Sequence, residues 1–177
     1  GITTNDDDLA EFETYGTNSV YVNNFNNLLR LNLATQDVQG EFYLGNSNIN
    51  PMNFQDTGIT SLDAFEVSGL NSINLKGCSD LVTLNLFSCV DLEELDLSDC
   101  SSLEVLAVHE NSSLETVIFP TENNLVNIQA NDSGINHAIT LTNVDTLDIV
   151  NFSTTSIPSL SITGCEVLGQ VNAHHCA

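Results

Sequence analysis

The chain has 177 residues, of which 41% are hydrophobic, so it is long enough to form one sizeable core. Its 24 acidic residues stand against two basic ones, Arg30 and Lys76, and give a formal net charge of -22. This charge excludes nucleic acids and anionic lipid surfaces as partners, because proteins bind both through lysine and arginine. It favours solubility and cationic partners, and it is typical of a solvated surface in a salty extracellular medium.

The first 16 residues are acidic and lack the pattern that follows; Asp6, Asp7 and Asp8 are consecutive. A solenoid exposes the open edge of its first coil, so a capping segment is expected there. A frayed tail is the alternative for the first few residues. We therefore predict an acidic N-terminal cap or tail over residues 1–16.

From residue 17 onward the sequence repeats every eleven residues, most clearly between Leu81 and Asn124. Written in elevens, that stretch reads LVTLNLFSCVD, LEELDLSDCSS, LEVLAVHENSS and LETVIFPTENN. Each unit has the form L-x-x-L-x-L-x-x-[C/N/E]-x-x, although two units near Gln39 and Ile49 are one residue short. Fixed-period self-similarity indicates a repeat architecture. No linker interrupts the pattern, so we predict one solenoid domain over residues 17–177.

The fourth and sixth residues of a unit are apolar, as in Leu84/Leu86 and Leu95/Leu97. This spacing predicts a short β-strand with both side chains on one face. Eleven residues hold a strand and a turn but no helix with its loops, so two units are expected to form one 22-residue coil. We predict about seven coils whose parallel strands are stacked roughly 4.8 Å apart.

The repeated LxxLxLxxC pattern and the string Leu95-Asp96-Leu97-Ser98-Asp99-Cys100 resemble those of bacterial cell-surface leucine-rich-repeat proteins with short repeats. Some internalins and many gut-bacterial surface proteins have this form. The resemblance covers most of the chain. It implies a mainly β, right-handed solenoid with few or no long helices, secretion or display at the cell surface, and a binding role. A curved horseshoe and a flattened two-sheet coil both fit it.

All five cysteines occupy the ninth position of a unit: Cys78, Cys89, Cys100, Cys165 and Cys176. The resemblance implies that this position points inward, where Asn or Cys satisfies backbone groups of the turns. Cysteines in adjacent coils would lie about 4.8 Å apart, which permits a disulfide, but parallel side chains are poorly aimed at each other. The odd number also leaves at least one thiol free. We expect a structural ladder of buried, reduced thiols.

Catalytic and metal-binding motifs are missing from the sequence. His174, His175 and Cys176 suggest zinc, but adjacent histidines on a strand point to opposite faces, and there is no CxxC or HExxH. There is no GxSxG or GxxxxGK[ST] either, and a stack of thin coils has no natural cleft. We expect no enzyme activity, no metal site and no cofactor.

Outward-facing aromatic residues recur every 22 residues, and they are the candidate binding site: Tyr21, Tyr43, Phe65, Phe87 and His109. Because of the short units, the two tyrosines occupy the fifth position and the other rings the seventh. An exposed aromatic stripe is typical of a binding surface for proteins or sugars. Rings covered by the N-terminal segment or by long turns are the alternative.

These patterns predict a non-catalytic binding or adhesion module at a bacterial cell surface, with a protein or a glycan as its partner. A structural spacer within a larger surface protein is the alternative. Ice binding is a remote third interpretation, because Thr140-Leu141-Thr142 and Ser161-Ile162-Thr163 form a short Thr-x-Thr array. No polar capping unit follows the last ladder cysteine, so end-to-end self-association through the C-terminal coil is also considered.

Overall fold

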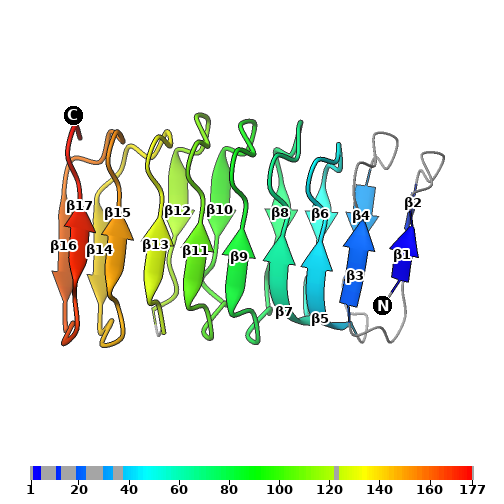
Figure 1. Cartoon of the computed structure of the whole chain (residues 1–177), viewed down its shortest axis with the longest axis horizontal. Coiled ribbons are helices and arrows are strands. Elements are labelled where there is room, and N and C mark those ends of the chain that lie inside the picture. The colour runs from blue at the N-terminus through cyan, green and yellow to red at the C-terminus, as the bar shows by residue number, and fades with distance from the viewer. Residues whose placement is uncertain are drawn as a thin grey trace.

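The computed structural model describes residues 2–4, 11–12, 19–22, 30–33, 38–121 and 124–176. Up to residue 30 only the backbone is described. Over these residues the chain is mainly β, without helix, and its short parallel strands are stacked into a solenoid (Figure 1). The stack makes about six turns, close to the seven predicted. The predicted fold class is thus confirmed.

One wall of the solenoid is a parallel sheet of nine strands, which we call the first sheet. Its strands are β1 (Ile2–Thr4), β3 (Ser19–Val22), β5 (Gln39–Tyr43), β7 (Gly58–Asp63), β9 (Thr83–Asn85), β11 (Val105–Ala107), β13 (Asn127–Gln129), β15 (Ile149–Asn151) and β17 (Gln170–Asn172). Each strand pairs with the equivalent strand of the next turn, so Leu84 lies opposite Leu62 on one side and Leu106 on the other.

The opposite wall consists of three separate sheets, which together we call the second wall. The sheets are β2 (Glu11–Phe12), β4 (Arg30–Asn32), β6 (Met52–Asn53) and β8 (Ile73–Asn74); then β10 (Glu94–Asp96) and β12 (Thr116–Ile118); then β14 (Ile139–Thr142) and β16 (Leu160–Thr163). The strands β1 and β2 lie in the segment expected to be a cap or tail, and they pair with β3 and β4. The rest of residues 1–16 lies outside the described residues.

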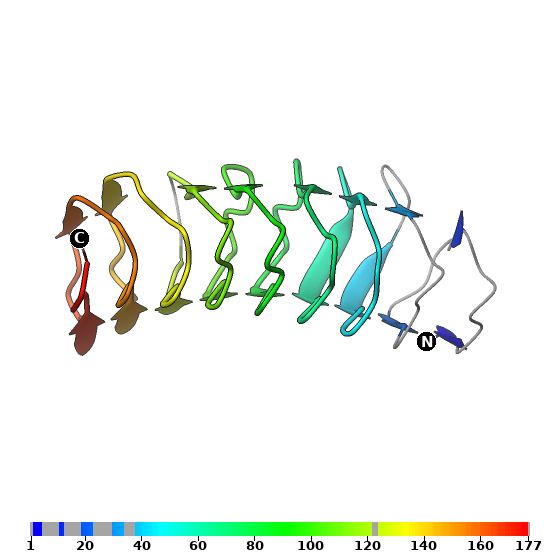
Figure 2. The ribbon, with the colours of Figure 1, turned by 90° about the horizontal axis from the view of Figure 1, so that it is seen from above.

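The stack is a shallow arc with the first sheet on its inner side (Figure 2). Because the outer side of an arc is longer, the strands of the second wall are spread farther apart, and ladder hydrogen bonds are missing between β8 and β10 and between β12 and β14. Isolated hydrogen bonds cross each break in place of a ladder. The Gly77 N–H donates to Asp99 Oδ2 at 3.1 Å, and the Val117 N–H donates to His137 Nε2 at 3.2 Å.

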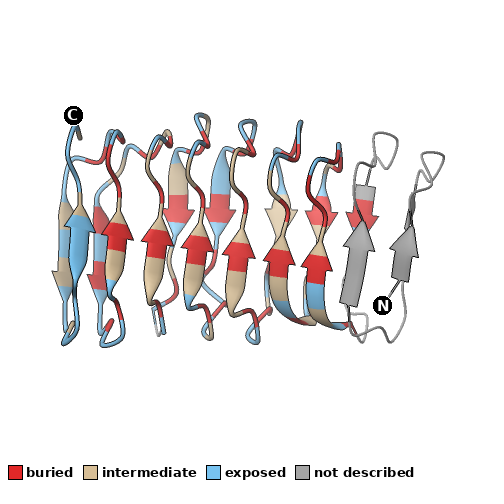
Figure 3. Cartoon of the chain, viewed as in Figure 1, coloured by how far each residue is buried: buried red, intermediate tan, exposed pale blue. Residues whose placement is uncertain are grey.

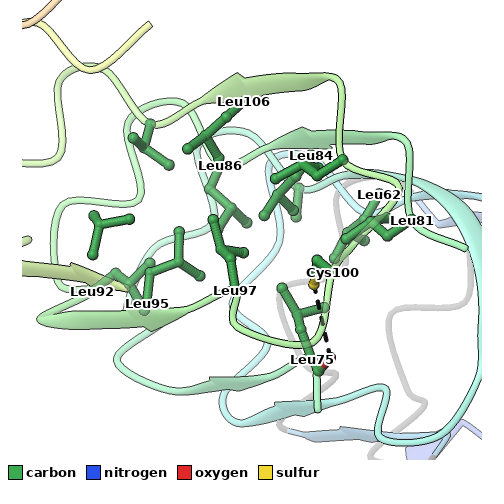
Figure 4. Close-up of a cluster of buried hydrophobic side chains, with 14 of the residues drawn as sticks. Leu62, Leu75, Leu81, Leu84, Leu86, Leu92, Leu95, Leu97, Cys100 and Leu106 are labelled. Carbon is green, nitrogen blue, oxygen red and sulfur yellow. Dashed lines mark hydrogen bonds between the residues drawn. The ribbon is translucent and has the colours of Figure 1, made fainter. Parts of the chain in front are cut away.

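The core is a thin apolar layer between the two walls (Figure 3). The paired leucines predicted to point inward do so, and Leu84, Leu95 and Leu106 are at most 1% exposed. Figure 4 shows leucines of both walls meeting in this layer. Burial of a leucine side chain stabilises the fold by about 1.5–3 kcal/mol before conformational entropy is counted, and the repeat supplies such residues in every turn.

Two backbone devices turn the chain between strands. The residue directly before most ladder positions has a positive φ of 54–61°, as at Ser88, Glu110 and Thr154. Gly77 and Gly164 occupy the same position with φ of 73° and 69°. The second device is an Asx turn at the end of the strand, in which Asn85 Oδ1 accepts a hydrogen bond from the Phe87 N–H at 3.1 Å. The same bond is made by further described side chains: Asn53, Asp63, Asn74, Asp96 and Asn151.

Candidate binding surface on the first sheet

Three of the predicted rings lie in consecutive turns at the edge of the first sheet. The Glu66 N–H donates to the carbonyl oxygen of Phe87 at 2.7 Å, and the Ser88 N–H donates to that of His109 at 3.1 Å. This register places Phe65, Phe87 and His109 one above another. The same column continues through three polar residues: Asn131, Ser153 and His174.

Tyr43 joins these rings from a neighbouring column. Its Cα partner on β7 is Asp63, because the pairing of β5 with β7 shifts at Gly40/Glu41. The Tyr43 and Phe65 rings nevertheless meet edge to face, with centroids 5.6 Å apart. Gly45 provides the space for this contact, because a Cβ atom at this position would collide with the Phe65 ring. Tyr43, Phe65, Phe87 and His109 form what we call the ring row.

The Phe87 and His109 rings are stacked, with centroids 4.5 Å apart and an interplanar angle of 26°. All four side chains of the ring row are half-buried, so each is partly covered by its neighbours and partly open to solvent. The His109 Nδ1 atom is buried and has no hydrogen-bond partner. For Tyr21, the fifth predicted member, the backbone pairs with Tyr43, but its side chain lies outside the described residues.

Polar side chains from the ends of several strands of the first sheet lie beside the ring row. Asn85 Nδ2 donates to Asp63 Oδ1 at 2.8 Å, and Asn151 Nδ2 donates to Asn131 Oδ1 at 3.0 Å. Burial raises the pKa of Asp63, against the opposing effect of hydrogen bonds from the Asn85 amide and the Phe65 N–H. The sequence analysis did not single out these polar side chains, although Asp63, Asn85 and Asn151 recur at one position of the repeat.

The ladder position is structural where its residues are described. Cys78, Cys89 and Cys100 are fully buried, Cys165 and Cys176 are half-buried, and all five thiols are free. Their Sγ atoms approach backbone carbonyl oxygens of the preceding turn at 3.1–3.9 Å, each an acceptor for a thiol donor. Asn111 replaces the thiol in its own turn and donates through Nδ2 to the carbonyl oxygens of Leu86 and Val108 at 2.9 and 3.0 Å.

The zinc alternative gains no support from the geometry. The His174 and His175 rings meet edge to face with centroids 5.1 Å apart, and Cys176 Sγ lies 3.2 Å from the carbonyl oxygen of Phe152. Among the described residues, no group of three or more His, Cys, Asp or Glu side chains is arranged to hold a metal ion.

The second wall has shallow hollows at its two breaks. The hollow between β8 and β10 measures about 360 Å³ and is lined by Asn74, Lys76, Asp96 and Asp99, among others. The hollow between β12 and β14 measures about 250 Å³ and is lined in part by Phe119, Pro120 and His137.

The exposed threonines of the second wall lie on β14 and β16. Thr140 lies opposite Ser161 and Thr142 opposite Thr163, and all four side chains are exposed. In the preceding turn the equivalent positions hold Ile118 and Pro120. The regular array is therefore two strands wide.

Comparisons with protein-family models, curated proteins and solved structures give no match to this chain. Within the described residues, no helix has the length and apolar character required to cross a membrane.

Proposed function

We propose that this chain is a leucine-rich-repeat recognition module of a bacterial cell surface, secreted or displayed there, which binds a protein or glycan partner through the ring row without catalysing a reaction. The observation that carries the proposal is the position of Tyr43, Phe65, Phe87 and His109. Tyr43 contacts Phe65 and Phe87 stacks on His109, and all four rings remain partly open to solvent. The first sheet, at whose edge they lie, forms the inner side of the arc (Figure 2). Rings that are rigid and only half-buried provide contact area at a low entropic cost.

The repeat pattern and the ladder support the leucine-rich-repeat assignment. In several turns the ninth position holds a Cys or Asn whose side chain satisfies carbonyl groups of the turns, as the resemblance implies. The inner wall is also the more regular one, so it presents side chains at a fixed spacing of roughly 4.8 Å per turn. Such a surface suits an extended ligand that contacts several turns at once.

The test is a double substitution that removes the ring faces but keeps apolar volume, Phe65→Leu with Phe87→Leu. A matched control, Ile118→Ala, changes an exposed apolar residue on the second wall. Both proteins would be measured by surface plasmon resonance against defined matrix proteins and polysaccharides, with circular dichroism as a check on folding. We expect the ring variant to lose about tenfold in affinity for its ligand, or about 1.4 kcal/mol, and the control to be unchanged.

The spacer interpretation makes the opposite prediction for the same experiment. A chain that only holds another domain away from the envelope would bind nothing through these rings, and any binding would be equal in the two variants. A large loss of thermal stability in the ring variant, without a change in affinity, would likewise assign the rings to the core. Ice binding receives less support, because the Thr-x-Thr array is confined to β14 and β16.

We propose in addition that the coil formed by β16 and β17 mediates weak self-association. Val167, Leu168 and Val171 in this coil are 39–55% exposed, which makes them three of the most exposed large apolar residues described. Glu166 is the single acidic residue after Asp148 in the sequence, so repulsion between two copies is weakest at this end. Apolar area combined with low charge is what a contact between two such acidic chains requires.

A further inference from the structure

We infer that the ligand of the ring row is a basic polypeptide segment whose lysine or arginine side chains lie over the rings. This inference rests on the proposed function and specifies the chemistry of the partner. It starts from the charge: 24 acidic residues against two basic ones disfavour an anionic partner and favour a cationic one. The remaining question is whether the ring row itself is built for a cation.

The groups around the ring row are acidic. Glu66 directly follows Phe65 and Glu110 directly follows His109, and both carboxylates are exposed in the turns at the edge of the first sheet. Asp63 precedes Phe65 by two residues and borders the row from the other side. Lys76 lies on the other wall, next to Asp96 and Asp99. The side chain of Arg30 is outside the described residues, so every charged side chain described beside the ring row is acidic.

Aromatic faces and carboxylates together match lysine and arginine. A cation over a Phe or Tyr ring is attracted by the negative face of the ring, and a guanidinium can stack on that ring while its N–H groups reach a carboxylate. Glu66 and Glu110 are exposed in left-handed turns, with φ of 54° and 59°, directly after Phe65 and His109. A neutral glycan would use the rings but would gain little from the flanking charges. The charge complementarity therefore favours the basic polypeptide over a sugar.

The experiment must separate a local site from the attraction that any chain of charge -22 exerts on a cation. Two double variants change the net charge equally: Glu66→Gln with Glu110→Gln beside the ring row, and Glu93→Gln with Glu94→Gln on the second wall. All four carboxylates are exposed. The probe is a fluorescein-labelled peptide of alternating glycine and arginine, and its binding is followed by fluorescence anisotropy at near-physiological salt. A glycine–glutamate peptide and cellohexaose serve as the anionic and neutral probes.

We expect the arginine peptide to bind, and the Glu66/Glu110 variant to weaken it roughly fivefold while the Glu93/Glu94 variant weakens it less than about twofold. The Phe65→Leu, Phe87→Leu protein should lose binding to at least the extent of the Glu66/Glu110 variant. Equal weakening by the two glutamine variants would reduce the interaction to bulk charge and overturn the inference. So would binding of cellohexaose, but not of the arginine peptide, at the rings.

The two proposals fail in different ways. If the ring substitutions abolish binding of a neutral glycan or an uncharged protein segment, the recognition function stands and the basic partner is wrong. If the ring substitutions change the binding of no ligand, while the variants remain folded by circular dichroism, both proposals fall.

Discussion

The Cys89 thiol donates a hydrogen bond to the carbonyl oxygen of Ala64, 25 residues earlier in the chain, at 3.1 Å. Burial raises the pKa of Cys89 to about 11 and that of Cys100 to about 12, and it raises the pKa of Cys78 as well. At about pH 8 only some thousandth of Cys89 is therefore thiolate, the form that reacts.

We expect a thiol reagent to find five reactive cysteines in the denatured, unreduced protein, because all five thiols are free. In the folded protein at mildly alkaline pH, the half-buried Cys165 and Cys176 should react first, and Cys78, Cys89 and Cys100 only on unfolding. Mass spectrometry after timed alkylation identifies the order. Fewer than five reactive thiols in denaturant would contradict the reduced ladder, and rapid labelling of Cys89 would contradict its burial.

Replacing Thr154 by glycine should stabilise the protein. Thr154 is an exposed, β-branched residue with φ of 61°, a conformation that costs an L-residue about 1–2 kcal/mol and glycine nothing. After the entropic cost of glycine, a net gain of up to about 1 kcal/mol remains. The control is Thr140→Gly, at an exposed position in the extended strand β14, which should destabilise by about 0.5–1 kcal/mol. Urea denaturation of the two variants measures both; a loss of stability in Thr154→Gly would count against the turn geometry.

Replacing Asp63 by asparagine should stabilise the protein in a pH-dependent way. Burial raises the folded-state pKa of Asp63 above its ordinary value of 3.8, so the folded state holds the proton more tightly than the unfolded state. The contribution of Asp63 to the free energy of unfolding is therefore most favourable below pH 3.8, and it declines as the pH rises through the folded-state pKa. Asparagine keeps an acceptor for the Phe65 N–H and for Asn85, as do the asparagines of later turns.

The advantage of Asp63→Asn should accordingly be largest at neutral pH and shrink below the ordinary pKa of an aspartate. Thermal unfolding from acid to neutral pH, with the exposed Asp145→Asn as a control for net charge, tests this. An advantage that Asp145→Asn reproduces at every pH would show that general charge reduction, and not the burial of Asp63, is responsible.

The substitution Val171→Lys should keep the chain monomeric. Val171 is an inward-row residue of β17 and is 45% exposed. Sedimentation equilibrium of the wild type should show weak association that strengthens with salt, since salt screens the repulsion between acidic chains. The variant should show none, whereas Val90→Lys, at an exposed position elsewhere, should associate like the wild type. A wild type that stays monomeric at its highest soluble concentration would refute the contact.

The features that could be predicted from the sequence are those that a single unit encodes. The spacing of Leu84, Leu95 and Leu106 predicts that each lies on a strand, that each side chain points inward, and that the strands are stacked. These three features are linked because each side chain must contact its equivalent in the next turn. The ladder position is likewise encoded within each single unit. Its inward position persists where the residue type changes, as at Asn111 and Thr155, which are buried and bonded to turn carbonyls.

The features that could not be predicted depend on how turns differ from one another. The sequence placed Tyr43 at the fifth position of its unit and the later rings at the seventh, but it did not show that the Tyr43 and Phe65 rings meet across these two columns in the space left by Gly45. The spacing of 22 residues indicated that the rings recur, but not how much of each ring neighbouring turns would cover. The breaks after β8 and β12 are likewise invisible in the repeat, since they follow from the curvature of the whole stack.

Those two breaks give the rod unequal mechanical properties on its two sides. The first sheet runs unbroken through nine strands and resists stretching along its length, whereas the opposite side is three shorter blocks joined by isolated hydrogen bonds such as that from Val117 to His137. Force along the rod would be carried by the continuous side, and flexing would concentrate at the two seams. The face that presents the rings is therefore also the stiffest part of the molecule, and its spacing is preserved when the rod bends.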